Sequence, residues 1–226
     1  MRNKVKNDRE YKELFNKKLN YFHGELARGA VFKGDWDIPY VESNGVIPTK
    51  VIPFSKAMTT KDYDCWVVFY EDDFKFERIW NNPQRYLQTL KKFEGVVGPD
   101  YSLYGDYPLA VQIYNTYRSR LLTHWFKMNG IKVVPNVRWS TSYTYSFCFD
   151  GLKRNDIVFV GSHGCSKRKG DKALLVEGLK AMVQRISPNV ICVYGKTSLP
   201  IFEELRNKGI SIISFESECS CVHRGN

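Results

Sequence analysis

Short apolar runs rich in β-branched residues alternate with longer segments of helical periodicity from about residue 51 onward. The runs are almost continuously apolar, which is typical of parallel strands covered on both faces. This alternation predicts a parallel sheet with helices packed on it, and hence an α/β fold. The predicted strands are 51–54, 66–70, 95–98, 132–135, 157–160, 190–194 and 211–215, and the predicted helices are 83–93, 108–128, 171–186 and 198–208.

Proline and glycine mark the boundaries of these helices. Pro83 and Pro108 fit a first helical turn, where the missing N–H group is not needed. Gly130 and Gly209 stand where two of the helices should end. Seven strands in so short a segment favour a compact or incomplete (β/α) barrel-like arrangement with an N-terminal helical arm. An open doubly wound sheet is the alternative.

The first 50 residues have a different pattern. Through about residue 22 the chain is highly charged, with apolar residues at roughly helical spacing, which predicts an amphipathic helix. Residues 23–50 contain several glycines and two prolines, and predict an irregular arm that needs the main domain to fold against. We therefore expect an arm at 1–50 packed on an α/β domain at 51–226.

The composition is that of a folded, basic protein of 226 residues. Lys and Arg number 34 and Asp and Glu 24, so the formal net charge is +10, with an isoelectric point of about 9.2. This balance favours anionic partners, with nucleic acid or a nucleotide ahead of a membrane surface. No apolar run approaches the ~18–20 residues of a membrane span, and no apolar stretch follows the charged start of the chain, so a cytoplasmic location is expected.

Six cysteines are present, without a CxxC pair. Cys65 and Cys192 lie in the apolar runs DCWVVF and VICVY, where a free thiol behaves as a small buried apolar side chain. Reduced thiols and no disulfide are therefore expected. Cys219, Cys221 and His223 alternate near the end of the chain, but paired zinc ligands are usually spaced by about two to four residues, so a structural role is favoured over a metal site.

Polar residues follow most of the predicted strands, at the end where ligands bind in parallel α/β folds. Loops begin there in any case, but a mixture of acids, Arg and His favours a site over ordinary loop residues. We predict one concave rim that contains Asp72, Asp73, Asp100, Ser102, Asn136, Arg138, Trp139, Asp150, Gly161, Ser162, His163, Gly164, Cys165 and Glu216.

The acids of this set suggest a cation site. Asp72, Asp100 and Glu216 could hold a hard cation such as Mg²⁺ or Mn²⁺, which prefers oxygen ligands and pairs with phosphate substrates. Asp72 and Asp73 are adjacent, so only one of them would face the rim centre on a regular strand. The alternative is an ion network between the acids and Arg78, Arg118, Arg120 and Arg138.

A glycine-containing turn, 161–165, follows the strand at 157–160. Backbone N–H groups in such a turn can bind an anion, and the basic run at 167–169 would attract one. The P-loop pattern GxxxxGK[ST] is absent. His163 could act as a general acid or base near neutral pH, and Cys165 is a candidate nucleophile whose partner cannot be read from spacing. The structural alternatives are a His that tightens the turn and a buried Cys.

Several strings of the sequence carry a resemblance to a known family. They include VVFYEDDFKFERIWNNPQRYL (67–87), GVVGPDYSLYGDYPLAVQIYNTYRSR (95–120), GIKVVPNVRWS (130–140), FCFDG (147–151) and VGSHGC (160–165). Over about 51–218 the chain resembles the domain of unknown function 4417 family, whose members are products of bacteria, phages and plasmids. The resemblance places the family's motifs on the strand-end residues chosen above and carries no established reaction. His163, Cys219 and Cys221 lie outside the family pattern.

Three functions remain open. The first is an enzyme acting on nucleic acid or a nucleotide, as a metal-dependent phosphoester hydrolase or transferase, in which Arg138 clamps phosphate and the catalytic set is Asp72, Asp100, His163 and Glu216. The second is a non-catalytic nucleic-acid-binding protein that uses the basic surface. The third is a phage or plasmid accessory protein that inhibits or sequesters a host protein or a signalling nucleotide.

Overall fold

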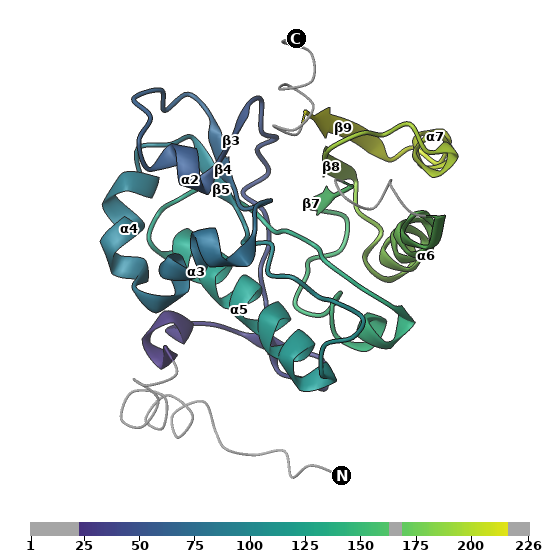
Figure 1. The fold of residues 1–226 in the computed structure, drawn as a ribbon, viewed down its shortest axis with the longest axis horizontal. Helices are drawn as coiled ribbons and strands as arrows, with labels where there is room; N and C mark the ends of the chain where they lie inside the picture. The colour runs from purple at the N-terminus through teal and green to yellow at the C-terminus, as the bar shows by residue number, and fades with distance from the viewer. Residues whose placement is uncertain (1–22, 163–168, 217–226) are drawn as a thin grey trace.

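Seven parallel strands, hydrogen-bonded in chain order, form the centre of the protein (Figure 1). The computed structural model describes residues 23–162 and 169–216. The first sheet has the order β3 (Val51–Pro53), β4 (Trp66–Val68), β5 (Gly95–Val97) and β6 (Val133–Val134). The second has the order β7 (Ile157–Gly161), β8 (Val190–Tyr194) and β9 (Ser211–Phe215).

The two sheets are joined where β6 meets β7. Asn136 forms an isolated parallel bridge with Phe159, and the Phe159 amide donates to the Pro135 carbonyl at 2.9 Å. Across the concave side, the Tyr70 and Tyr194 rings stack with their centres 4.8 Å apart. Both sheets contribute to one apolar inner cluster, which consists of Trp66, Val68, Val97, Val134, Ile157, Phe159, Cys192, Tyr194 and Phe215.

Helices cover the other side of each sheet, because strand residues that alternate with the inner cluster point outward. Helices α2 to α5 lie around the first sheet, and α6 and α7 lie beside the second (Figure 1). Their bounds are α2 (Phe54–Ala57), α3 (Asp73–Asn81), α4 (Pro83–Leu90), α5 (Leu109–Met128), α6 (Lys169–Ile186) and α7 (Pro200–Asn207), with 3₁₀ helices η2 (Gly24–Ala27) and η3 (Ser142–Ser146).

The predicted fold class is confirmed: parallel strands alternate with helices. Among the described strands β3 and β9 each have one neighbour, so the strands do not close into a barrel. The strands form two open parallel sheets in which strand order follows the chain, an arrangement that is compatible with the open-sheet alternative.

One element differs from expectation. Residues 73–81 form α3, a helix that is not among those predicted from the sequence. The helix begins directly after Asp72, and it buries Phe76 together with Ile79 and Trp80, which follow it by three and four residues. This spacing is helical, but the helix starts within an acidic run that also fits a loop at the rim of the sheet.

The described part of the N-terminal arm packs on the main domain. The Ser43 amide and hydroxyl both donate to Asp156, at 2.7 and 2.5 Å, and the Asn44 side-chain oxygen accepts from the Val133 amide at 2.8 Å. A short antiparallel pair, β1 (Phe32–Lys33) and β2 (Ile38–Pro39), adds the fully buried Ile38. The helix predicted through residue 22 lies outside the described residues.

Cys65, Cys148 and Cys192 are free and buried, as the positions of Cys65 and Cys192 in apolar runs predicted. Cys219, Cys221 and His223 lie outside the described residues. Within 23–162 and 169–216, no helix has the length and hydropathy needed to cross a membrane.

Candidate ligand-binding groove

A chain of polar side chains connects the ends of β4, β5 and β6. The Tyr70 hydroxyl donates to Asn136 Oδ1 at 2.6 Å, and Asn136 Nδ2 donates to Asp100 Oδ1 at 2.8 Å. Arg138 Nη1 donates to Asp100 Oδ2 at 3.0 Å. Asp100, Asn136 and Arg138 were predicted from their positions after strands, and the structure brings these three together.

Burial determines the protonation of the side chains in this hydrogen-bonded row. Asp100 and Asn136 are buried, whereas the Arg138 side chain remains 30% exposed. Burial raises the pKa of the Asp100 carboxyl above its ordinary value, although the Arg138 guanidinium and the Asn136 amide act in the opposite direction. Burial also raises the pKa of the Tyr70 hydroxyl, which therefore stays a neutral donor. Because each oxygen of Asp100 accepts a hydrogen bond from a neighbour, this carboxyl positions Asn136 and Arg138.

Arg120 of α5 supports the same region from below. Its guanidinium donates to the carbonyls of Asn136 and Cys148, at 2.5 and 2.9 Å, and its side chain is almost completely buried. Burial lowers the pKa of Arg120 to about 10. Its Nε atom has no hydrogen-bond partner among the described residues.

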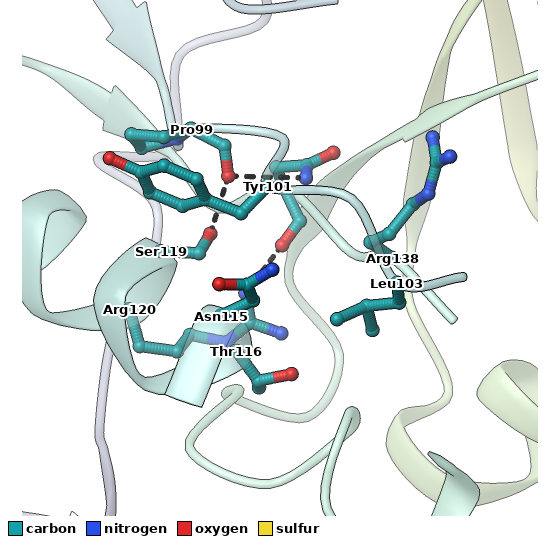
Figure 2. A pocket seen from close by; sticks show the side chains of 9 residues that line it. Pro99, Tyr101, Leu103, Asn115, Thr116, Ser119, Arg120 and Arg138 are labelled. Carbon is teal, nitrogen blue, oxygen red and sulfur yellow. Dashed lines mark hydrogen bonds between the residues drawn. The ribbon is translucent and has the colours of Figure 1, made fainter. Parts of the chain in front are cut away.

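A small cavity of about 10 Å³ lies between α5 and the strand ends, with Arg120 and Arg138 in its lining. Its volume is close to that of one water probe. Figure 2 shows Arg138 and Leu103 on one side of it, and Pro99, Tyr101 and Ser119 on the other. The Ser119 hydroxyl donates to the Pro99 carbonyl at 2.6 Å, which fixes the start of the loop after β5 to α5.

A larger groove opens on the outer side of Arg138. Its volume is about 350 Å³, within the ~300–1,000 Å³ range of small-molecule sites. Three segments line it: the loop after β5, residues 137–140 after β6 with Gly161 of β7, and the first turns of α6. The lining residues are Leu103, Tyr104, Gly105, Val137, Arg138, Trp139, Ser140, Gly161, Asp171, Leu174 and Leu175.

Trp139 forms the rigid part of the groove wall. Its indole Nε1 donates to the Leu174 carbonyl of α6 at 3.1 Å. The ring lies against Gly178, where a Cβ atom would overlap the indole. Trp139 and Gly161, both predicted site residues, therefore line the groove together with Arg138.

Asp73 and Ser102 belong to a neighbouring structural cluster. The Ser102 amide and hydroxyl donate to the Asp73 carboxylate at 3.1 and 2.8 Å, which ties the loop after β5 to the start of α3. Next to it, Arg118 pairs with Glu77 at 2.6 Å and stacks on the Tyr101 ring at 3.9 Å. Of the predicted ion network between the rim acids and the four arginines, the described ion pairs include Arg138 with Asp100, whereas Arg118 pairs with Glu77 and Arg120 donates to backbone carbonyls.

The remaining predicted residues lie apart from Asp100 in their described contacts. Asp72 is 68% exposed and pairs with Lys75, and Glu216 is exposed directly after β9. Asp150 pairs with Arg185 at 3.2 Å, at the opposite end of α6 from the groove. The Ser162 hydroxyl donates to the Lys196 carbonyl at 2.9 Å. His163, Gly164 and Cys165 lie outside the described residues.

The predicted cation site is not assembled by Asp72, Asp100 and Glu216. Within the part of the chain that the structure describes, no three His, Cys, Asp or Glu side chains are grouped so that they could hold a metal ion. The reason lies in the backbone: Asp72 precedes a helix and faces solvent, whereas Asp100 is buried beneath Arg138.

The sequence did not identify Tyr70 and Asp171 as residues of the site, and it suggested Arg120 only as a partner of the acids in an ion network. Tyr70 was assigned to the end of a strand, and its position directly before an acidic run was the available signal. Asp171 begins the predicted helix 171–186, where an acid is ordinary as a partner of the helix dipole. Arg120 lies inside a long helix, and no local pattern distinguishes a buried Arg from a surface Arg there.

The chain is similar to two curated phage proteins, which agrees with the phage members of the family that it resembles. The chain is 36% identical over 128 residues to the Gene 1 protein of Mycobacterium phage L5 and, over the same length, to the Gene 1 protein of Mycobacterium phage D29. The matches cover 57% of this chain, and 56% and 47% of the two relatives, so the chain spans about half the length of the curated relatives it matches. No solved structure matches it significantly.

The family model named "Domain of unknown function (DUF4417)" matches residues 30–216, which include all strands from β1 to β9, the polar chain from Tyr70 to Arg138, and every residue that lines the groove. The protein therefore belongs to the DUF4417 family.

Proposed function

We propose that the groove binds a phosphate-bearing ligand of the nucleotide or nucleic-acid class, and that Arg138 contacts its phosphate. The observation that carries the proposal is the position of Arg138: its guanidinium is held by the buried Asp100, lines the groove and remains partly exposed. A guanidinium fixed by a buried carboxylate is preorganised, so little side-chain freedom is lost when it binds an anion.

Two further observations support this assignment. The groove lies at the carboxyl ends of β5, β6 and β7, where parallel α/β folds place their ligands. The net charge of +10 favours the approach of anionic molecules.

The same groove fits an enzyme that acts on a nucleotide and a protein that sequesters one. The contacts of Asp100 favour sequestration, because both of its oxygens are used to hold Asn136 and Arg138. We therefore propose binding as the primary function, and Asp100 as a positioning residue for Arg138. Release of phosphate or of a cleaved product from a bound nucleotide would instead support the enzyme.

The substitution Arg138→Lys tests this proposal. Lysine keeps the charge but loses the planar fork, so we expect nucleotide affinity measured by titration calorimetry to fall about tenfold or more, a change of ~1.4 kcal/mol. Arg206→Lys is the matched control, because Arg206 is 39% exposed, pairs with Glu203 and lies on α7 away from the groove lining.

The control variant should keep the affinity of the original protein, and both variants should keep its melting temperature within about 2 °C, which is ~1 kcal/mol or less for a chain of this size. A lower melting temperature of Arg138→Lys with unchanged binding would show that Arg138 is a structural partner of Asp100 and that the proposal is wrong.

A further inference from the structure

We propose that the groove takes a single nucleotide unit rather than a continuous nucleic-acid backbone, with Asp171 accepting hydrogen bonds from the donors of the sugar or the base. This inference rests on the proposed function, because it assumes that Arg138 contacts the phosphate. It assigns Asp171 as the residue that determines ligand specificity.

Asp171 lies in the first turn of α6 and lines the groove together with Arg138. It is partly buried, and no hydrogen bond or ion pair links its carboxylate to any described residue. An unpaired carboxylate in a groove wall is an acceptor for ligand O–H and N–H groups, and a charged acceptor forms a hydrogen bond about twice as strong as a neutral one.

The charge pattern of the groove argues against a polyanion. Among the described residues, the ionisable groups that line it are the Arg138 guanidinium and the Asp171 carboxylate. Channels that follow a nucleic-acid backbone present cations to successive phosphates, and a carboxylate in the path would repel them. A mononucleotide has one anionic end, and its hydroxyl and amine donors lie at the other, so it matches a groove wall in which a cation and an acceptor lie together.

The apolar lining suits the remaining part of a nucleotide. Val137, Leu174 and Leu175 provide an aliphatic surface beside Trp139. The Trp139 ring is fixed by its bond to the Leu174 carbonyl and by its contact with Gly178, so this wall keeps its shape. A base can lie against such a surface, and a volume of about 350 Å³ is at the small end of the range for ligand sites. The groove is thus sized for one nucleotide.

Titration calorimetry on the full chain tests the inference. The probes are the four ribonucleoside 5′-monophosphates, their 2′-deoxy counterparts, inorganic phosphate and a ten-nucleotide single strand. We expect at least one monophosphate to bind more tightly than inorganic phosphate and than the single strand. Its affinity should fall only weakly with salt concentration, since a mononucleotide lacks the condensed counterions that a nucleic-acid polymer releases on binding.

Asp171→Asn is the decisive variant, and Glu177→Gln is its matched control. Glu177 lies on the same helix, is exposed and does not line the groove, so both variants remove one negative charge from α6. Asp171→Asn should weaken the preferred monophosphate about tenfold and leave inorganic phosphate unchanged or bound more tightly. Glu177→Gln should change neither affinity more than about twofold.

The set of nucleotides shows whether the sugar or the base donates the hydrogen bond to Asp171. If the sugar supplies it, the ribonucleotides lose their advantage over the deoxynucleotides in Asp171→Asn. If the base supplies it, the ranking of the four bases changes instead. Equal behaviour of Asp171→Asn and Glu177→Gln would overturn the inference.

Failure of the inference and failure of the proposed function give different results. Tight, Arg138-dependent binding of the single strand with a salt slope of several units would overturn the single-nucleotide inference and leave the proposed function standing. Absence of Arg138-dependent binding for every probe would overturn both.

Discussion

Asp100 illustrates how a single buried carboxyl sets the behaviour of a surface residue. It lies beneath Arg138 with both oxygens engaged, and burial raises its pKa despite the nearby guanidinium. A carboxyl whose pKa is higher in the folded than in the unfolded state favours folding in its neutral form. The stability that this provides is complete below the ordinary carboxyl pKa of 3.8, and is lost as the pH rises through the higher value of the folded state.

The substitution Asp100→Asn tests whether the contribution of Asp100 to stability decreases as the pH rises. Asparagine has nearly the same shape and stays neutral at every pH, so the free energy of unfolding of the variant, relative to the original protein, should increase as the pH rises from about 4 to 7. Urea unfolding at several pH values measures the difference. A difference that falls over this range would mean that the ionised Asp100 is the form the fold prefers, through its pair with Arg138.

The sequence identified the residues of the polar chain that follow strands directly. Asp100, Asn136 and Arg138 were found because parallel strands end at one rim, and their mutual contacts follow from that geometry. Asp150 was included for a similar position, but it follows η3 rather than a strand, and it lies beside Arg185. Both residues are aspartates in loops, so residue type alone could not show that Asp100 lies at the site and Asp150 does not.

Helix α6 is the element that links the groove to the second sheet. It contributes Asp171, Leu174 and Leu175 to the lining, and Gly178 lies against the Trp139 indole. Glycine inside a helix is usually unfavourable by ~1 kcal/mol relative to alanine, so its presence here requires a reason. The close approach of Trp139 to the helix backbone supplies that reason.

Two alanine substitutions on α6 separate helix propensity from packing. Gly178→Ala should destabilise the protein by about 1–3 kcal/mol, because the new methyl group overlaps Trp139 and must displace it. Gly170→Ala, on the same helix with no atom near the added methyl group, should be neutral or stabilising by up to about 1 kcal/mol. Chemical denaturation measures both, and equal effects would show that Trp139 moves away without loss of packing energy.

At the level of elements, the hydrophobic pattern was sufficient for the strands. β8 and β9 begin and end at the predicted residues, because their apolar runs are flanked by polar residues and glycine. Helix α3 was not predicted because it starts within an acidic run that was interpreted as part of a site. The spacing of its three buried residues indicates a helix, but this spacing can be assigned to a helix only when the preceding strand is known to end at Val68.

The whole molecule consists of two sheets that share one inner cluster. Backbone hydrogen bonds join them where β6 meets β7, and on the inner side the Tyr70 ring stacks on Tyr194 and lies 5.7 Å from the Phe159 ring. Strand pairing was predictable in outline, yet the curvature that brings β4 near β8 was not. It depends on how large aromatic side chains fill the concave side, and no local pattern reports that.

The shared cluster predicts that the two sheets unfold together. All five tryptophans precede β7 and, in the described part of the chain, Trp139 alone of them bonds to α6, so tryptophan fluorescence reports mainly on the first sheet and its surroundings, whereas far-ultraviolet circular dichroism reports on both sheets. Ile191→Ala removes a fully buried side chain from β8 and should destabilise the protein by about 2–5 kcal/mol. If the inner cluster couples the sheets, both signals should shift to the same lower denaturation midpoint, as in a two-state transition.

Val111→Ala, at a 40% exposed position on α5, is the control and should shift neither signal appreciably. An early circular-dichroism step in Ile191→Ala without a matching fluorescence change would show that β7 to β9 unfold independently, and that the cluster does not make the two sheets one cooperative unit.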